Sequence, residues 1–185
     1  MQIAFRTLLA IAAVTALAVV AYAYSAIEDV AASRPEGAVT GWLLTTIRDR
    51  SIERRASGIK VPPLDDPKLI AEGFGHYHEM CTGCHLAPGI DSSEIRAGLN
   101  PQPPVLAEIV PNSNPARLFW VIKNGVKMTG MPAWGASHSD GMIWAMVAFL
   151  EKLPGMTPAQ YQAMEKQALQ TEADGEGGAH SHHHR

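Results

Sequence analysis

The chain has 185 residues, a formal net charge of −3 and two cysteines. The mild net charge argues against a nucleic-acid-binding protein, because such proteins neutralise phosphates with a strongly basic surface. The length suggests one domain with additional segments at its ends.

The N-terminal segment, residues 1–27, is predicted to be a membrane anchor. From Thr7 to Ile27 the chain carries no charged residue. As a helix, this uncharged segment is long enough to cross the ~30 Å hydrocarbon core of a bilayer. A cleaved signal peptide is the alternative, and residues 21–23 (Ala-Tyr-Ala) would suit its cleavage site, but its apolar region would normally be only ~7–15 residues long. We therefore expect an uncleaved transmembrane helix, and either interpretation exports the rest of the chain.

Residues 28–66 are predicted to connect the anchor to the folded domain. Within them, residues 42–56 could form a short amphipathic helix whose first half is apolar and whose second half is rich in arginine. Such a helix could lie on anionic lipid or dock on a membrane partner. Because Asp49 and Glu53 interleave the arginines, we favour a helix that packs beside the domain with its charges in water.

The five residues 81–85, Cys-Thr-Gly-Cys-His, carry the clearest functional signal. C-x-x-C-H is the attachment signature of c-type haem: Cys81 and Cys84 can each form a thioether with one porphyrin, and His85 is then held against the iron as proximal ligand. A thioredoxin-type thiol pair would require a βαβ context, and a zinc site would lack its fourth ligand. We predict one covalent haem c.

Around this motif the sequence predicts a helical haem domain over residues 67–153. Asp66 and Pro67 form a helix start, and apolar residues then recur every four positions as far as Cys81. Gly73 inside this helix would cost about 1 kcal/mol relative to alanine. A glycine at this position suggests that another backbone crosses closely there.

Three further helices are predicted over residues 116–123, 140–153 and 158 to about 170. Their N-terminal caps are Asn114, Ser139 and Thr157. The apolar stripe of the second of them should cross the first helix near Gly73, whereas the third is mostly polar and is expected to be peripheral. The proline- and glycine-rich residues 87–111 show no helical or strand period and are predicted to be a loop.

This loop is expected to wrap the proximal edge of the haem. The backbone carbonyl of Pro103 or Pro104 could accept a hydrogen bond from His85 Nδ1 and thereby fix the tautomer of the imidazole. Arg96 could contact a haem propionate or be an ordinary surface arginine, and the sequence favours neither interpretation.

The sixth iron ligand is predicted to be a methionine. A thioether is a neutral, soft donor that favours Fe(II) and raises the reduction potential. Met131 stands between glycine and proline in a loop, whereas Met142 belongs to a helical apolar stripe and is predicted to be a core residue. Met131 is therefore the predicted ligand, with Met128 as the second choice. Trp134 could donate its indole N–H to a propionate or cover the haem edge.

After the haem domain, residues 154–172 are predicted to hold the C-terminal helix and residues 173–185 to form a disordered, histidine-rich tail. The histidines in residues 180–184 could bind divalent transition metals such as Cu²⁺, Ni²⁺ or Zn²⁺. We favour an unstructured end without such an affinity.

Three features resemble class I monohaem c-type cytochromes, most closely the bacterial membrane-anchored periplasmic type. They are the motif at 81–85, Gly73 with Tyr77, and the run Gly-Met-Pro-Ala-Trp at 130–134. The resemblance covers roughly residues 67–153. It implies an all-α class I cytochrome c fold, here with one N-terminal transmembrane helix, and His85 and Met131 as axial ligands. By analogy, Met146 and Phe149 would be the crossing partners of Gly73 and Tyr77.

The function that this resemblance implies is electron transfer rather than enzymatic catalysis. The chain would be tethered to the cell inner membrane with its haem domain in the periplasm, and would serve redox protein partners such as a dehydrogenase, an oxidase or another cytochrome. The alternatives are a haem subunit fixed in a larger oxidoreductase complex, and a haem peroxidase or gas-binding sensor with a labile sixth ligand. His76 and His78 are poor distal ligands for such a sensor, because both precede Cys81 on the same helix.

Overall fold

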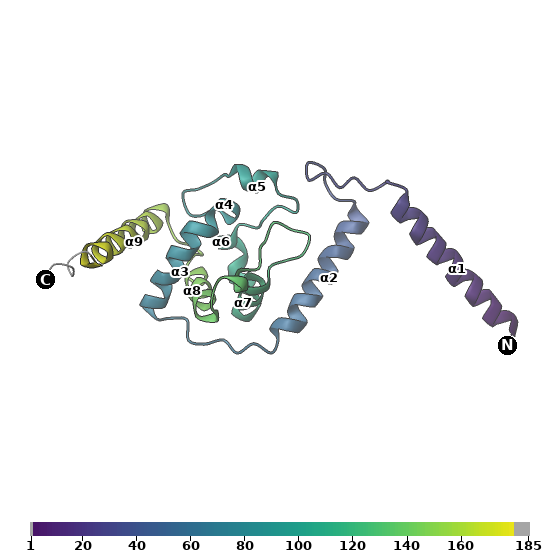
Figure 1. Cartoon of the computed structure of the whole chain (residues 1–185), viewed down its shortest axis with the longest axis horizontal. Coiled ribbons are helices and arrows are strands. Elements are labelled where there is room, and N and C mark those ends of the chain that lie inside the picture. Colours follow the sequence, from purple (N-terminus) through teal and green to yellow (C-terminus); the bar gives the residue numbers. More distant parts are fainter. Residues whose placement is uncertain (1, 180–185) are drawn as a thin grey trace.

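The computed structural model describes residues 2–179, and within them the chain is helical without a strand (Figure 1). The helices are α1 Gln2–Tyr24, α2 Ala38–Ala56, α3 Pro67–Met80, α4 Thr82–His85, α5 Glu94–Gly98, α6 Leu106–Ile109, α7 Pro115–Asn124, α8 Asp140–Leu150 and α9 Pro158–Ala179. Two 3₁₀ turns complete them, η1 Val110–Asn112 and η2 Trp134–Ala136. The all-α prediction is confirmed.

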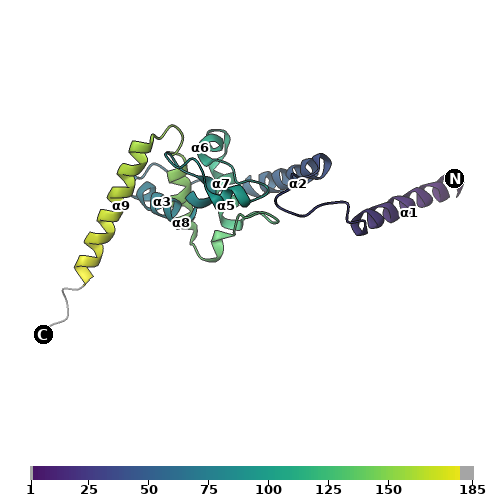
Figure 2. The same ribbon diagram turned by 90° about the horizontal axis from the view of Figure 1, so that it is seen from above.

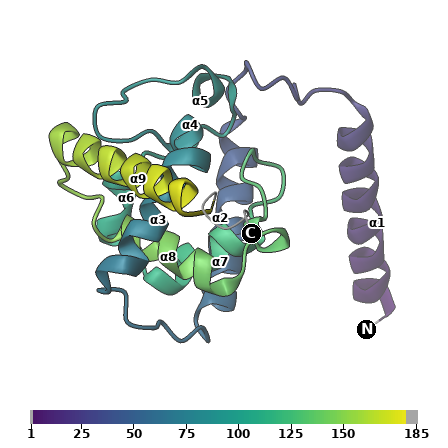
Figure 3. The same ribbon diagram turned by 60° about the vertical axis from the view of Figure 1, so that its left-hand side comes forward.

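The crossing of α3 with α8 forms the core of the domain (Figure 3). A Cβ atom placed on Gly73 would lie 1.9 Å from the Ala145 carbonyl oxygen and 3.0 Å from the Met146 nitrogen, so only glycine permits this approach. One turn further along α3, the rings of Tyr77 and Phe149 pack with their centroids 5.2 Å apart. Both parts of the expected crossing are confirmed.

Helix starts follow the predicted capping residues. In each case the side-chain oxygen of the capping residue accepts a hydrogen bond from a backbone amide in the first turn of the helix. The pairs are Asp66 with the Lys68 amide, Asn114 with the Ala116 amide and Ser139 with the Met142 amide. Helix α8, in contrast, ends at Leu150 rather than at the expected residue 153. The amides of residues 152 and 153 bond to carbonyls three residues back, a tightening that is common at a helix end and that precedes Pro154 here.

Residues 87–111 contain short helices, so the prediction of a featureless loop is wrong. Helix α5 is capped by Ser93, whose side chain accepts a hydrogen bond from the Arg96 amide, and α6 runs for a single turn after Val105. Helices of one turn are too short to show a period of 3.6 residues. Pro101, Pro103 and Pro104 lie between them in a segment without regular secondary structure.

Helix α9 differs from expectation in two ways. It continues past Gln170 to Ala179, beyond the predicted end of the C-terminal helix at residue 172. Adding residues to an existing helix is cheaper than starting a new one. It is also not peripheral, because it passes close to α3 (Figure 3). Tyr161 is only 2 % exposed, and its ring packs on Phe74 of α3. The predicted metal-binding histidines at 180–184 lie outside the described residues.

Helix α2 begins at Ala38, four residues earlier than expected, after Gly37 in extended conformation. Its second half packs on the haem domain: Ile52 is 3 % exposed, and the guanidinium of Arg117 on α7 donates to Asp49 at 2.9 Å. The prediction of a helix that packs beside the domain is therefore confirmed for this half.

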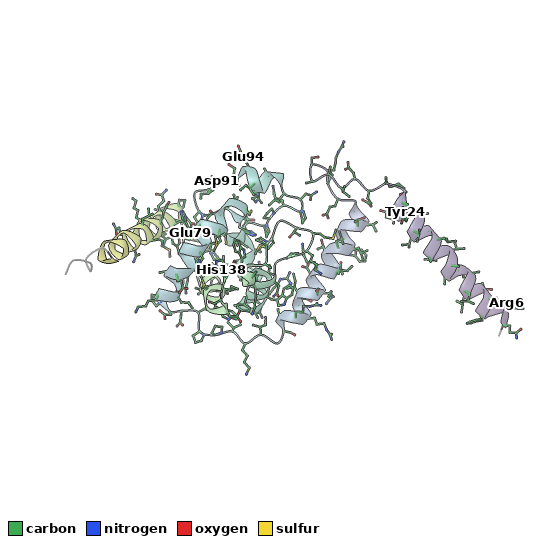
Figure 4. All side chains as sticks on the ribbon, in the orientation of Figure 1. Arg6, Tyr24, Glu79, Asp91, Glu94 and His138 are labelled. Carbon is green, nitrogen blue, oxygen red and sulfur yellow. The ribbon has the colours of Figure 1, made fainter. Side chains whose placement is uncertain are left out.

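Helix α1 is long and apolar enough to cross a membrane, with a mean hydropathy of 2.3 over its most apolar window and no residue buried against the rest of the chain. Arg6 lies near its first end and Tyr24 at its last (Figure 4). An apolar N-terminal helix of this kind fits a membrane protein.

Candidate haem site

A cavity of about 1070 Å³ opens between α2, α3, α7 and the loops that follow α4 and α7. It exceeds the ~300–1,000 Å³ of ordinary small-ligand pockets. The cavity brings together most of the side chains singled out in the sequence, namely Cys81, Cys84, His85, Met131 and Trp134. The cavity thus collects residues that lie up to about fifty positions apart in the chain.

The Cys-x-x-Cys-His segment is held in place by helix α3. Cys81 ends α3 and precedes α4, and the hydroxyl of Thr82 donates to the His78 carbonyl at 2.8 Å. Beyond His85 the chain turns at Leu86, whose φ of 63° is in the left-handed region. The Tyr77 hydroxyl donates to the Leu86 carbonyl at 2.6 Å, and this buried hydrogen bond fastens the turn to the core.

Neither cysteine is in a disulfide. Burial and, to a smaller extent, the nearby Cys84 raise the pKa of the Cys81 thiol to about 12. Thioredoxin-type redox pairs instead have an attacking thiol with a lowered pKa, usually at the N-terminus of a helix in a βαβ setting. Within residues 2–179, no group of three or more His, Cys, Asp or Glu side chains could hold a metal ion by itself. Two unpaired thiols at Cys-x-x-Cys spacing, followed directly by a histidine, match the attachment motif of a c-type haem.

The imidazole of His85 is oriented by the loop that follows α5. Its Nδ1 lies 2.8 Å from the Pro104 carbonyl oxygen. A carbonyl can only accept, so Nδ1 carries the proton and the lone pair of Nε2 is free to bind a metal. The expected carbonyl partner is therefore Pro104, while the Pro103 carbonyl accepts from Arg96 Nε at 3.1 Å.

The protonation of His85 agrees with this geometry. Burial lowers the pKa of the imidazole below its ordinary value, and the positive charge of Arg96 acts in the same direction. The hydrogen bond to Pro104 opposes this effect without reversing it. The neutral imidazole, which is the metal-binding form, is therefore favoured at neutral pH.

Met131 lines the cavity from a tight loop after α7. The Val126 amide donates to the Met131 carbonyl at 3.2 Å, and the Met131 amide donates to the Thr129 hydroxyl at 3.1 Å. Gly125 begins the loop with a φ of +64°, and a Cβ there would lie 2.7 Å from the Pro132 carbonyl carbon. Met128, the second choice, does not line the cavity and is 87 % exposed.

The other predicted contacts divide between the cavity and the surface. Trp134 lines the cavity, whereas Arg96 does not and uses its Nε on the Pro103 carbonyl. His76 and His78 are also absent from the lining. Nδ1 of His78 is 3.2 Å from the Tyr161 hydroxyl, so this imidazole faces α9.

Sequence reasoning missed the wall that α2 gives to the cavity. Arg48, Asp49 and Ile52 of α2 line it, together with Arg117 of α7. Burial acts to raise the pKa of Asp49, but hydrogen bonds from Arg48 and Arg117 and their charges outweigh it, and the pKa lies below its ordinary value. Asp49 thereby joins α2 to α7 beside the cavity. No local signal could have found a contact between residues so far apart in sequence.

The crossed helices, the Cys-x-x-Cys-His turn and the loop bearing Met131 define a c-type cytochrome domain. Residues 68–150 match the family described as cytochrome c oxidase, cbb3-type, subunit III, and this segment of the chain is accordingly a c-type cytochrome domain. Among curated proteins, no relative matches the chain. A domain of this class binds haem c, and its role is haem-based electron transfer.

Proposed function

We propose that the chain is a membrane-tethered electron carrier with one covalent haem c that passes single electrons between redox protein partners. The observation that carries the proposal is that His85 and Met131 line one cavity, with Nε2 of His85 left free by the hydrogen bond between Nδ1 and Pro104. When bound, the haem iron supplies a one-electron change between Fe(III) and Fe(II).

Each side chain of the site has a proposed role. Cys81 and Cys84 hold the porphyrin through thioethers, and His85 binds the iron through Nε2. Met131 would supply a thioether to the iron, which would leave no open position for small molecules and would favour the ferrous state, and Trp134 would cover the haem. A closed sixth position is what distinguishes a carrier from a peroxidase or a gas-binding sensor.

The proposed location is the inner membrane, with α1 as an uncleaved anchor and the haem domain on the periplasmic side. The apolar length of α1 and the position of Arg6 near its N-terminal end support this orientation, since positive residues stay on the cytoplasmic side. In this organisation residues 1–27 are the anchor, residues 28–66 connect it, and residues 67–153 form the haem domain.

A haem subunit fixed in a larger oxidase is the second candidate function. The description of the matching family, subunit III of a cbb3-type oxidase, favours it. In both functions the chain carries electrons and transforms no substrate. They differ in whether the partner contact is permanent.

Substitution of the methionines tests the proposed ligand set. We expect Met131→Ala to abolish the weak long-wavelength band that methionine–iron ligation gives the ferric protein, and to let the ferrous protein bind carbon monoxide rapidly, because the sixth position is opened. Absorption spectra of the purified haem-loaded protein measure both effects.

Met128→Ala is the matched control. Because Met128 is exposed and lies outside the cavity, its removal should leave the spectrum unchanged. Loss of the band in Met128→Ala together with its retention in Met131→Ala would move the ligand to Met128. Rapid binding of carbon monoxide by the unmodified protein would contradict a carrier.

A further inference from the structure

The first half of α2 exposes an apolar surface on the side away from the haem domain. The exposed fractions are 77 % for Val39, 66 % for Trp42, 47 % for Leu43, 42 % for Leu44 and 57 % for Ile47. Val39, Leu43 and Ile47 follow one another at intervals of four, so they form one row along the helix. Helices at the surface of soluble domains turn polar residues outward, so this row needs a partner. We call it the outer row of α2.

The same side of α2 becomes cationic after Ile47. Arg50 and Arg54 continue the outer row at helical spacing, and both are exposed. The side chain of Arg50 is 81 % exposed and forms only a loose ion pair with Glu53 at 3.6 Å. A helix face that combines apolar residues, a tryptophan and arginines is typical of segments that lie in the headgroup region of a bilayer.

The start of α2 is joined to the end of α1 through one carboxylate. Glu28 accepts a hydrogen bond from the Tyr22 hydroxyl in the last turn of α1, and another at 2.9 Å from the Thr40 hydroxyl in the first turn of α2. These hydrogen bonds lower the pKa of Glu28, so the carboxylate remains charged at neutral pH. The neighbouring ends of α1 and α2 lie on the same side of the molecule (Figure 1).

The length of chain between the two helices sets an upper limit on their separation. Residues 25–37 could span at most about 45 Å if fully extended, and the Glu28 bridge makes them far more compact. When α1 crosses the bilayer, the first turn of α2 is consequently held near the membrane surface. This arrangement places three aromatic residues near the membrane surface, namely Tyr22, Tyr24 and Trp42. Aromatic side chains are enriched at membrane–water interfaces.

We infer that the outer row of α2 lies in the interfacial region of the phospholipid bilayer, with Val39, Leu43 and Ile47 at the acyl boundary and Arg50 and Arg54 toward anionic headgroups. This inference rests on the proposed membrane tether. Its consequence is orientation: the opposite side of α2 lines the haem cavity through Arg48 and Ile52, so lipid contact fixes how the haem domain is presented. Helix α9 then lies far from the membrane anchor, at the end of the molecule opposite α1 (Figure 2).

Spin labels on the full-length, haem-loaded protein test the inference. Leu43→Cys and Ile47→Cys each add one thiol on the outer row, and Lys166→Cys adds one on the exposed side of α9 as a matched control. Each variant is reconstituted in vesicles of equal parts phosphatidylcholine and phosphatidylglycerol. The accessibility of each nitroxide to oxygen, which concentrates in lipid, is compared with its accessibility to a water-soluble nickel chelate.

We expect the oxygen-to-nickel accessibility ratio to be severalfold higher at positions 43 and 47 than at position 166. Equal ratios at the three positions would overturn the inference. Spin–spin broadening between position-43 labels at high lipid dilution would also overturn it, because a second copy of the chain would then cover the outer row. Replacing Arg50 and Arg54 together by glutamine should lower the ratio at position 47 in these vesicles.

Two controls separate this inference from the proposed function. The parent protein without an added cysteine should take up no label, because its two thiols are in thioethers, and labelling of the parent would count against haem attachment instead. Co-flotation of the protein with the vesicles reports the tether through α1. Water-exposed labels on a protein that floats and carries haem would overturn only the placement of α2.

Discussion

Proline residues give the proximal side of the haem site its hydrogen-bond acceptors. Pro101, Pro103 and Pro104 have no N–H group, so their segment cannot continue a helix. Its carbonyls are consequently available to side chains: that of Pro103 accepts from Arg96 and that of Pro104 from His85. The orientation of the His85 imidazole therefore depends on a proline-rich segment that cannot form a helix.

Gly73 determines how closely α3 and α8 can approach. Because a Cβ at this position would lie 1.9 Å from the Ala145 carbonyl oxygen, Gly73→Ala must push two backbones apart. We expect a loss of about 3 kcal/mol in the free energy of unfolding or failure to fold, at the upper end of overpacking effects. Denaturant unfolding of the haem-loaded protein in detergent, followed by haem absorption, measures it.

Gly75 on the same helix provides the control. A Cβ at Gly75 would meet no atom within 4 Å. Gly75→Ala should therefore stabilise the protein by up to about 1 kcal/mol, which is the difference in helix propensity between the two residues. Similar effects of the two substitutions would show that Gly73 is not limited by the crossing.

At the scale of elements, α2 is attached to the haem domain by burial and by one carboxylate. Ile52 and Ala56 are buried against the domain, while Asp49 joins Arg48 of its own helix to Arg117 of α7. The side chains of Asp49 and Arg117 are 36 % and 31 % exposed, so water screens the pair. Burial of apolar side chains should therefore hold α2 more strongly than the ion pair does.

Asp49→Asn tests the contribution of this carboxylate. We expect the free energy of unfolding to fall by at most about 1 kcal/mol at neutral pH, because the pair is partly exposed. The pKa of Asp49 is lowered in the folded protein, so the stabilisation is complete above the ordinary aspartate pKa of about 3.9 and is lost as pH falls through the lower folded value. The difference in unfolding free energy between the two proteins should therefore be constant from neutral pH down to about 3.9 and shrink as the pH is lowered further.

Glu53→Gln is the comparison for Asp49→Asn. Glu53 faces Arg50 at 3.6 Å with both side chains more than half exposed, so its replacement should change stability by only a few tenths of a kcal/mol. An effect as large as that of Asp49→Asn would mean that general surface charge, rather than the bond to Arg117, accounts for the difference. A gap between wild type and Asp49→Asn that persisted in acid, where Asp49 is protonated, would show that the charge of this carboxylate does not account for the difference.

At the scale of the whole molecule, local sequence signals predicted where the helices start and which turns carry the candidate iron ligands. They did not predict the contacts between segments that lie far apart in the chain. Asp66, Asn114 and Ser139 cap helices through hydrogen bonds to residues two or three positions away, so sequence alone reveals them. The contact of Asp49 with Arg117 and the packing of Tyr161 on Phe74 join distant segments. Neither contact leaves a periodic pattern.

The Gly73 crossing shows when a long-range contact can be predicted. A glycine within a helix carries an energetic cost, so its presence indicates a close neighbour even though the sequence does not name it. The resemblance to class I cytochromes supplied that neighbour in the α8 segment around Met146. For α2, which lies outside the resemblance, no such guide existed, and its contribution to the cavity wall had to come from the structure.

Exposed apolar side chains are distributed unevenly over the described residues. From α3 to the end of α8, the large ones are scattered, namely Ile90, Ile95, Ile109 and Met128. Those of α1 and of the outer row of α2 are contiguous. Permanent subunit interfaces are large and more apolar than ordinary surface, so among the described residues a permanent contact would be expected on α1 or on the outer row of α2.

This distribution predicts how the native protein behaves when it is extracted. If its contiguous apolar surface is matched to lipid, mild detergent should replace the lipid, and the haem protein should sediment as one copy of the chain with bound detergent. That result would favour a free carrier over an oxidase subunit.

Sedimentation velocity of the extracted protein, followed by its haem absorption, measures the size of the particle, and protein identification of the fractions shows which chains it contains. Stoichiometric co-sedimentation with other membrane subunits through ion exchange would instead place the chain in a permanent complex, whose contacts would then have to involve α1 or the outer row of α2.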